Sequence, residues 1–87
     1  MPFTVELRQL AAEEYVWAIG HRPDYARKID DLLKVLITDP FKGIGKPEPL
    51  KHGLKGFWSR RVTKEHRLVY QVKGNKVSVV RCLEHYD

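Results

Sequence analysis

The clearest pattern along the chain is an amphipathic stretch in its first half. Apolar residues recur there at i, i+4, i+7, i+8 and i+11, and charged residues fill most of the positions between them. This spacing puts the apolar residues on one side of a helix. The residues of this stripe are Tyr25, Ile29, Leu32, Leu33 and Leu36. Pro23 stands where a helix can begin, and Asp39-Pro40 is expected to end it.

An earlier helix is predicted from Gln9 to Ile19. Its apolar positions at helical spacing are Ala12, Tyr15, Val16 and Ile19. We expect Trp17 to pack between this helix and the edge of a sheet. The stretch Gly20-His21-Arg22-Pro23 is expected to break the chain between the two helices.

The rest of the chain reads as strands and one irregular connection. Phe3–Leu7 predicts a short first strand, and residues 41–56 are rich in Gly and Pro, as in a loop. Three strand-like runs with short turns between them then follow, at Phe57–Thr63, His66–Val72 and Lys76–Leu83. The predicted order is β-α-α-β-β-β. It indicates one α+β domain over residues 1–87, with both helices on one face of a mostly antiparallel sheet.

The opposite face of this sheet is therefore available for a functional site. On the run from His66 to Val72, Leu68 and Tyr70 share one side by the two-residue period, and Arg67 lies on the other. If Leu68 and Tyr70 pack on the helices, Arg67 points outward. The same alternation allows only one of Arg60 and Arg61 to face that way.

Composition excludes several classes of protein. The 87 residues are 43% hydrophobic and 31% charged, which is typical of a folded domain. The one cysteine, Cys82, allows neither an internal disulfide nor a cysteine-built zinc site, and we expect it to be a buried strand residue. His52 and His66 lack partners at metal-ligand spacing, so no metal or other cofactor is expected. With no apolar run of membrane-spanning length and no signal-like start, we expect a cytoplasmic protein that does not enter a membrane.

The net charge of +5 is concentrated in one segment. Between Lys42 and Arg67 there are eight cations and only two acids, Glu48 and Glu65. Such a field attracts polyanions, although a solvated basic loop would have the same composition. Aromatic residues are interleaved with these cations, among them Phe57 and Trp58, which is typical of single-stranded RNA binding. Trp58 itself can be either a core residue or a stacking platform.

The chain also contains residue types sufficient for RNA cleavage. The 2′-hydroxyl of RNA attacks the adjacent phosphate when a base removes its proton, cations stabilise the transition state, and an acid protonates the departing oxygen. Glu48 is the only acid between Lys42 and Lys64 and is a candidate base. Arg61 and Arg67 are candidate phosphate clamps. Each of these residues can also be an ordinary surface group.

One long motif resembles a known family. The stretch from Gly45 to Tyr70 reads GKPEPLKHGLKGFWSRRVTKEHRLVY and closely resembles the YoeB-type toxins of the RelE superfamily. The terminal His85-Tyr86 resembles this family as well. A weaker similarity to the family extends to Trp17, Ile29, Asp39-Pro40-Phe41 and Gly43. The resemblance implies the α+β fold and a bacterial toxin that enters the ribosomal A site and cleaves mRNA without a metal ion.

The resemblance also implies roles for individual residues. Glu48 matches the general base, Arg67 the cation that stabilises the transition state, and Arg61 a further catalytic or phosphate-binding arginine. His85 matches the general acid, and Tyr86 the residue that orients the substrate base. The basic residues that we expect to bind RNA are Lys46, Lys51, His52, Lys55 and Arg60.

The implied partners are a cognate antitoxin, the ribosome with its mRNA, and a second copy of the chain. Operator DNA is expected only through the toxin–antitoxin complex. The alternative is a non-enzymatic inhibitor of DNA gyrase on the same fold, as in the ParE-like relatives, because a fold alone does not determine function. A plain RNA-binding module is a third possibility. Neither of these would use Glu48 or His85 as an acid–base pair.

Overall fold

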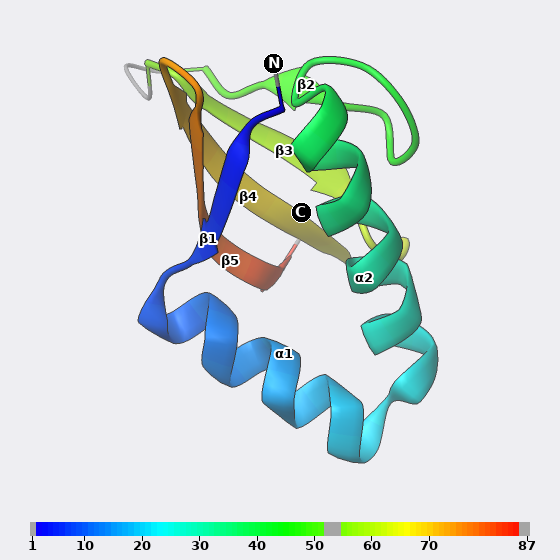
Figure 1. Ribbon diagram of the computed structural model, residues 1–87. Helices are drawn as coiled ribbons and strands as arrows, with labels where there is room; N and C mark the ends of the chain where they lie inside the picture. Colours follow the sequence, from blue (N-terminus) through cyan, green and yellow to red (C-terminus); the bar gives the residue numbers. More distant parts are fainter. Residues whose placement is uncertain (1, 52–54, 86–87) are drawn as a thin grey trace.

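The computed structural model describes residues 2–51 and 55–85 and has two helices beside one sheet (Figure 1). Its elements are β1 (Thr4–Leu7), α1 (Gln9–His21), α2 (Pro23–Thr38), β2 (Glu48–Pro49), β3 (Phe57–Arg61), β4 (His66–Lys73) and β5 (Lys76–His85). The strand order is β1-β5-β4-β3-β2, in which only β1 and β5 run parallel. The predicted fold class is therefore confirmed. No described helix has the length and apolar character needed to cross a bilayer.

Helix α2 buries the stripe that its spacing predicts. Ile29, Leu32 and Leu36 have no exposed surface, and they belong to one core cluster with Leu68 and Tyr70 of β4. Burying each large aliphatic side chain contributes roughly 1.5–3 kcal/mol. The core thus lies between α2, α1 and the near face of the sheet.

Helix α1 contacts the core through a face that includes the predicted Tyr15 but not the predicted Val16 and Ile19. Its fully buried residues are Ala11 and Ala18, whereas Val16 is 67% and Ile19 53% exposed. The prediction that Trp17 packs against the sheet edge is also wrong, because this side chain is 47% exposed and stacks on the ring of His21. Small alanine side chains let the helix approach the sheet closely, and that approach turns the larger residues outward.

Element boundaries differ from the predictions in two places that matter for the site. The connection predicted as irregular contains a two-residue strand, β2, in which Glu48 pairs with Ser59. Strand β5 continues to His85, so this histidine is a strand residue instead of part of a tail. Residue Cys82 of β5 is fully buried, as predicted, and burial raises the pKa of its thiol to about 12.

The two faces of the sheet separate the neighbouring arginines of β3. Arg60 lies opposite Leu68, on the near face that the helices cover, and Arg61 lies opposite Arg67. Paired residues of an antiparallel ladder share a face, so Arg61 and Arg67 both belong to the other side of the sheet, called the far face below. This confirms the prediction that Leu68 and Arg67 of β4 lie on opposite faces of the sheet. It also confirms that only one of Arg60 and Arg61 lies on the face away from the helices.

Arg60 is completely buried and is the centre of a polar network. Its Nε donates to the hydroxyl of Tyr70 at 3.0 Å, and that hydroxyl donates to a backbone carbonyl of the loop after α2 at 2.6 Å. The two Nη atoms donate to three further carbonyls of this region at 2.7–2.9 Å. The accepting carbonyls, counting the one bonded by Tyr70, belong to Asp39, Pro40, Lys42 and Ile44.

The prediction that Arg60 binds RNA is therefore wrong. A guanidinium whose donors are used by buried acceptors cannot reach a ligand without losing those bonds. Its role is to hold the loop after α2 against β3 and β4.

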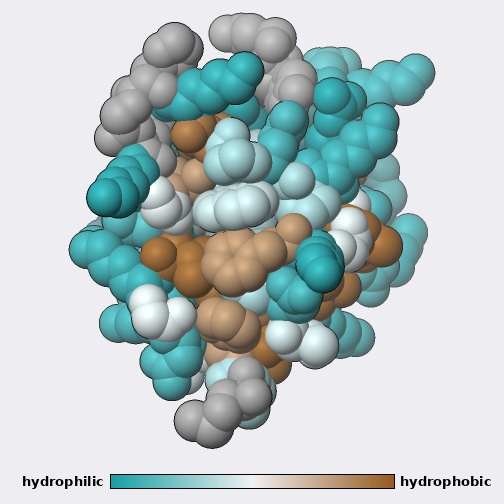
Figure 2. All heavy atoms as spheres, turned by 90° about the horizontal axis from the view of Figure 1, so that it is seen from above, coloured by the Kyte–Doolittle hydropathy of each residue, from teal (hydrophilic) through white to brown (hydrophobic). Residues whose placement is uncertain are grey.

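An aromatic cluster closes the same end of the molecule. The ring of Phe41 lies 5.2 Å from that of Trp58 and 6.4 Å from that of Phe3. Trp58 packs partly buried against the core, so the structure favours the core reading of this residue over the stacking platform. Figure 2 looks down on this end and shows hydrophobic side chains gathered at its middle, with hydrophilic ones around them.

The buried network predicts a large difference between two adjacent arginines. We expect Arg60→Met to lower the free energy of unfolding by about 3 kcal/mol or more, because several buried carbonyls lose their donor. Arg61→Met, with the same change of side chain on the far face, should cost about 1 kcal/mol or less. Urea denaturation followed by circular dichroism measures both. Equal losses in the two variants would contradict the structural role of Arg60.

Candidate active site and nucleic-acid interface

A carboxylate and two guanidiniums lie on the far face of the sheet. Glu48 is paired with Ser59, which is two residues from Arg61 on β3, and Arg67 is directly opposite Arg61. The register therefore puts Glu48, Arg61 and Arg67 on one side of three adjacent strands. Glu48 is exposed, whereas the two arginines are half-buried with buried Nε atoms. The structure thus brings together three of the five predicted catalytic residues.

A hollow of about 260 Å³ lies beside Arg67 on this face. Its apolar lining comes from Leu50, Phe57, Val69 and Val80. Its charged lining comes from Arg67, Arg81 and Glu84. A flat apolar floor beside a guanidinium can take a nucleobase on the floor and its phosphate at the cation.

His85, the predicted general acid, lies on β5, next to the strand that carries Arg67. Its neighbour on that strand is His66, whereas we expected it to lie beside Arg67. In the register, Glu84 is opposite Arg67, and His85 is opposite His66. The rings of the two histidines are 6.0 Å apart, and the ring of His66 lies 5.6 Å from that of Tyr25 in α2. By the strand alternation His85 is directed to the helix side. The expected convergence of His85 with Arg67 on one pocket is thus not provided by this register.

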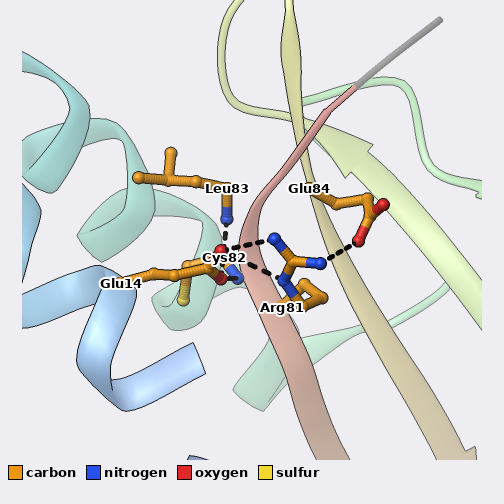
Figure 3. Close-up of polar contacts among 5 residues, drawn as sticks. All are labelled: Glu14, Arg81, Cys82, Leu83 and Glu84. Carbon is orange, nitrogen blue, oxygen red and sulfur yellow. Dashed lines mark hydrogen bonds and ion pairs between the residues drawn. The ribbon is translucent and has the colours of Figure 1, made fainter. Parts of the chain in front are cut away.

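The end of β5 is held by a carboxylate from helix α1 (Figure 3). Strand β1 pairs with β5 only as far as Val79, so the edge N–H groups beyond it need another acceptor. Glu14 supplies it, because its Oε1 accepts the backbone N–H groups of Cys82 at 2.8 Å and Leu83 at 3.2 Å. Its Oε2 accepts two bonds from Arg81, at 3.0 and 2.7 Å. The same guanidinium also binds Glu84.

The electrostatics of this contact follow from its partners. Desolvation by burial acts to raise the pKa of Glu14, but the hydrogen bonds from Arg81 and from the two backbone amides outweigh it, so the pKa is lowered. The glutamate hydrogen bond raises the pKa of Arg81 further. The carboxylate is therefore charged at neutral pH and fixes the direction in which β5 leaves the sheet.

Sequence reasoning did not identify Glu14, Arg81 or Glu84. An arginine inside the apolar run from Val77 to Leu83 is the one signal that could have indicated a buried partner. The partner itself is 67 residues away in the chain and becomes visible only in the fold.

The remaining predicted RNA-binding residues lie in the connection before β3. Lys46, Lys51 and Lys55 are exposed, whereas His52 and Tyr86 lie outside the described residues. Over residues 2–51 and 55–85, no three His, Cys, Asp or Glu side chains are grouped so that they could hold a metal ion.

Comparisons with known proteins identify the class of protein to which this fold belongs. A profile for the YoeB-like toxin of bacterial type II toxin–antitoxin systems matches residues 8–86. The chain therefore belongs to the YoeB-like toxin family. It is 40% identical over 83 residues to the toxin YoeB of Synechocystis, an alignment that covers 95% of this chain and 96% of that protein.

Solved structures extend this likeness to three dimensions. A YoeB/ParE toxin from Agrobacterium tumefaciens matches with a TM-score of 0.89 and 37% identity, covering 97% of this chain and 100% of that one. The YoeB dimer from Staphylococcus aureus matches with a TM-score of 0.88, again at 37% identity, over 99% of this chain and all of that one. A heterotetrameric YoeB–YefM toxin–antitoxin complex from the same organism matches at 0.85, with the same identity and coverage.

The contact of Glu14 with β5 predicts a pH-dependent contribution to stability. We expect Glu14→Gln to lower the free energy of unfolding by about 1–3 kcal/mol at pH 7. Because the folded pKa is lowered, the carboxylate stabilises the fold above the ordinary value of 4.5, and this contribution is lost as the pH falls through the folded pKa. The difference in the free energy of unfolding between wild type and variant should therefore disappear below about pH 4, as measured by urea titrations.

Glu13→Gln is the matched control, since this neighbouring carboxylate is exposed and accepts a hydrogen bond from the side chain of Gln9, one helical turn earlier, at 3.1 Å. It should change stability by less than about 0.5 kcal/mol at either pH. If Glu14→Gln lowers the free energy of unfolding by the same amount at pH 7 and at pH 3, the charge of Glu14 does not stabilise the fold.

Proposed function

We propose that this protein is the toxin of a type II toxin–antitoxin system and that it cleaves mRNA in the ribosomal A site. The observation that carries the proposal is the placement of Glu48, Arg61 and Arg67 on one face of the sheet, within the block that resembles the family. A base beside two fixed cations is what phosphodiester cleavage through the 2′-hydroxyl requires.

The proposed reaction needs only groups of the protein and the RNA. Glu48 takes the proton of the 2′-hydroxyl, and the resulting oxygen attacks the adjacent phosphorus. Arg61 and Arg67 stabilise the extra negative charge of the transition state. The bond from phosphorus to the 5′-oxygen breaks, His85 donates a proton to that oxygen, and a 2′,3′-cyclic phosphate forms. Tyr86 orients the base of the substrate.

The contribution of each catalytic residue to the reaction rate depends on whether it acts as an acid, a base or a cation. A positioned acid or base contributes typically ~10²–10⁴-fold to the rate, and one preorganised donor to a developing charge ~10²–10³-fold. Losing Glu48 or either arginine should therefore abolish detectable toxicity without unfolding the protein.

The acid role of His85 requires a local change at the end of β5. A shift of one residue in strand pairing moves every side chain to the other face of the sheet. We propose that engagement of RNA on the ribosome turns His85 from the ring of His66 toward Arg67. The exposed position of His85, at the end of β5, supports such a movement.

The proposed partners follow from the family. The S. aureus relative is found in a complex with the antitoxin YefM and as a dimer. We propose a comparable antitoxin and a homodimer for this chain, in a cytoplasmic system that contacts operator DNA only through the toxin–antitoxin complex. We also propose that residues 1–87 form the single toxin domain.

Primer extension on cellular mRNA after induction tests the proposal. Wild type should produce discrete cleavage sites, and Glu48→Gln, Arg67→Met and His85→Ala should each remove them by at least ~10²-fold. Glu65→Gln removes an exposed acid of the same basic segment and should leave cleavage unchanged.

Two outcomes would overturn the proposal. Intact message together with damaged DNA would favour inhibition of DNA gyrase. Cleavage that survives in Glu48→Gln and His85→Ala would remove the acid–base mechanism. Purified variants with wild-type urea midpoints are required for each comparison.

A further inference from the structure

Strand β5 carries an extra residue near its end, compared with its partner β4. Cys82 and Leu83 together lie opposite one residue of β4, Leu68. The pairs that flank this place are Val69–Arg81 and Arg67–Glu84. Two residues against one make a β-bulge, a feature that is frequent next to active sites, where it changes the direction of a side chain.

This bulge decides to which side of the sheet the last residues of β5 point. In the observed register, Glu84 is on the far face opposite Arg67, and His85 is on the helix side. Arg81 lines the hollow of the far face. In a regular strand, the alternation that starts from Arg81 would put Leu83 and His85 on the far face too. One residue of register therefore separates the proposed acid from the proposed cations.

Glu14 of helix α1 holds the bulge in a way that a regular strand does not allow. Successive N–H groups of a regular strand point to opposite edges, so a single acceptor atom cannot bind both. At the bulge, the Oε1 atom of Glu14 accepts the N–H groups of both Cys82 and Leu83, at 2.8 and 3.2 Å (Figure 3). The regular register would break at least one of these bonds. Glu14 therefore binds the bulged form selectively.

Arg81 connects the same carboxylate to the end of the strand. Its Nε and Nη2 atoms donate to the Oε2 atom of Glu14 at 3.0 and 2.7 Å, and its Nη1 atom donates to Glu84. Arg81 and Glu84 share a face only in the bulged register, so this ion pair favours the same form. The side chain of Glu14 is 14% exposed and that of Glu84 33%, so the contacts of Glu14 are the better shielded from water.

We propose that Glu14 is a positioning residue, whose carboxylate holds the bulge and thereby keeps His85 on the helix side of the sheet. The end of β5 is then a two-state element, with Glu84 beside Arg67 in one register and His85 there in the other. An anion at Arg67 favours the second register, because the carboxylate of Glu84 repels it in the first. The inference deepens the proposed function and rests on it for the role of His85 as the acid.

Nuclear Overhauser contacts in the purified protein distinguish the two registers. The bulged register predicts contacts between the backbones of Arg67 and Glu84, and between the rings of His66 and His85. The regular register predicts a backbone contact between Arg67 and Leu83 in their place. Where one register is a minor form, relaxation dispersion of the same amides measures its population.

Glu14→Ala removes the acceptor of both N–H groups at the bulge. Losing these bonds should raise the ratio of regular to bulged register by roughly 10-fold or more. The contact between Arg67 and Leu83 should gain intensity, and the contact between the two histidine rings should lose it. Arg81→Met leaves Glu14 in place and should shift the ratio in the same direction by less, which provides a milder variant if Glu14→Ala unfolds.

Two further variants separate register from stability. Glu13→Ala, the matched control, removes the neighbouring exposed carboxylate, which binds Gln9, and should keep the wild-type contacts. Glu14→Gln keeps a side-chain oxygen that can accept both N–H groups, so it should keep the bulged contacts although its free energy of unfolding is lower. Unchanged contacts in both Glu14→Ala and Arg81→Met would overturn the proposal, as would equal shifts in Glu14→Gln and Glu14→Ala.

Deletion of Leu83 in the Glu14→Ala protein is a rescue experiment. It removes the extra residue, so a regular strand now places Glu84 opposite Arg67 and His85 opposite His66 without any clamp. The contact between the histidine rings should return. Its continued absence would show that Glu14→Ala disturbs the end of β5 by a route other than its register, and would overturn the proposal.

The result can be separated from that of the proposed function, because the contacts are measured without RNA. On ribosomes that carry mRNA, Glu14→Ala should cleave several-fold faster than wild type, since a larger fraction has His85 beside Arg67. If the contacts shift and the rate does not rise, the acid role of His85 fails and the positioning role of Glu14 stands. If wild type cleaves message and the contacts do not shift, only the positioning role fails.

Discussion

The arrangement of the site depends on one buried guanidinium. Arg60 takes the place of a core side chain on β3 and binds, directly or through Tyr70, the carbonyls of the loop that follows α2. Those carbonyls belong to residues outside the helices and strands, and an unpaired buried carbonyl costs about 1–3 kcal/mol. A charged donor with several N–H groups can satisfy them from a single position. The loop is thereby bound to the sheet.

This constraint explains why adjacent arginines have opposite roles. Strand alternation directs Arg60 into the core and Arg61 to the far face, where it lies opposite Arg67. A single strand thus supplies one cation to the fold and one to the surface. The two-residue strand β2 then adds Glu48 at the edge of the same face. The cluster of Glu48, Arg61 and Arg67 is thus built from the regular geometry of three adjacent strands.

The other end of the sheet is controlled from helix α1. Because β1 stops short of the end of β5, Glu14 completes the hydrogen bonding of that edge and holds Arg81 beside it. A helix and a strand at opposite ends of the chain therefore determine how the segment with Glu84 and His85 leaves the sheet. The catalytic use that we propose for His85 requires this segment to turn, so the contact of Glu14 defines the resting arrangement from which the turn begins.

The sequence by itself determined the element order, the buried stripe of α2 and the outward direction of Arg67, because these follow from local periodicity. The long motif also indicated the family. Four features were decided only by tertiary structure. The burial of Arg60 depends on acceptors in a loop 16–21 residues away, and Glu14 meets Arg81 across 67 residues. The exposure of Val16 and Ile19 depends on how closely α1 approaches the sheet, and the pairing of His85 with His66 depends on irregularities in the β4–β5 register. Periodicity assigns a side chain to a face, but only the packed chain decides what lies opposite it.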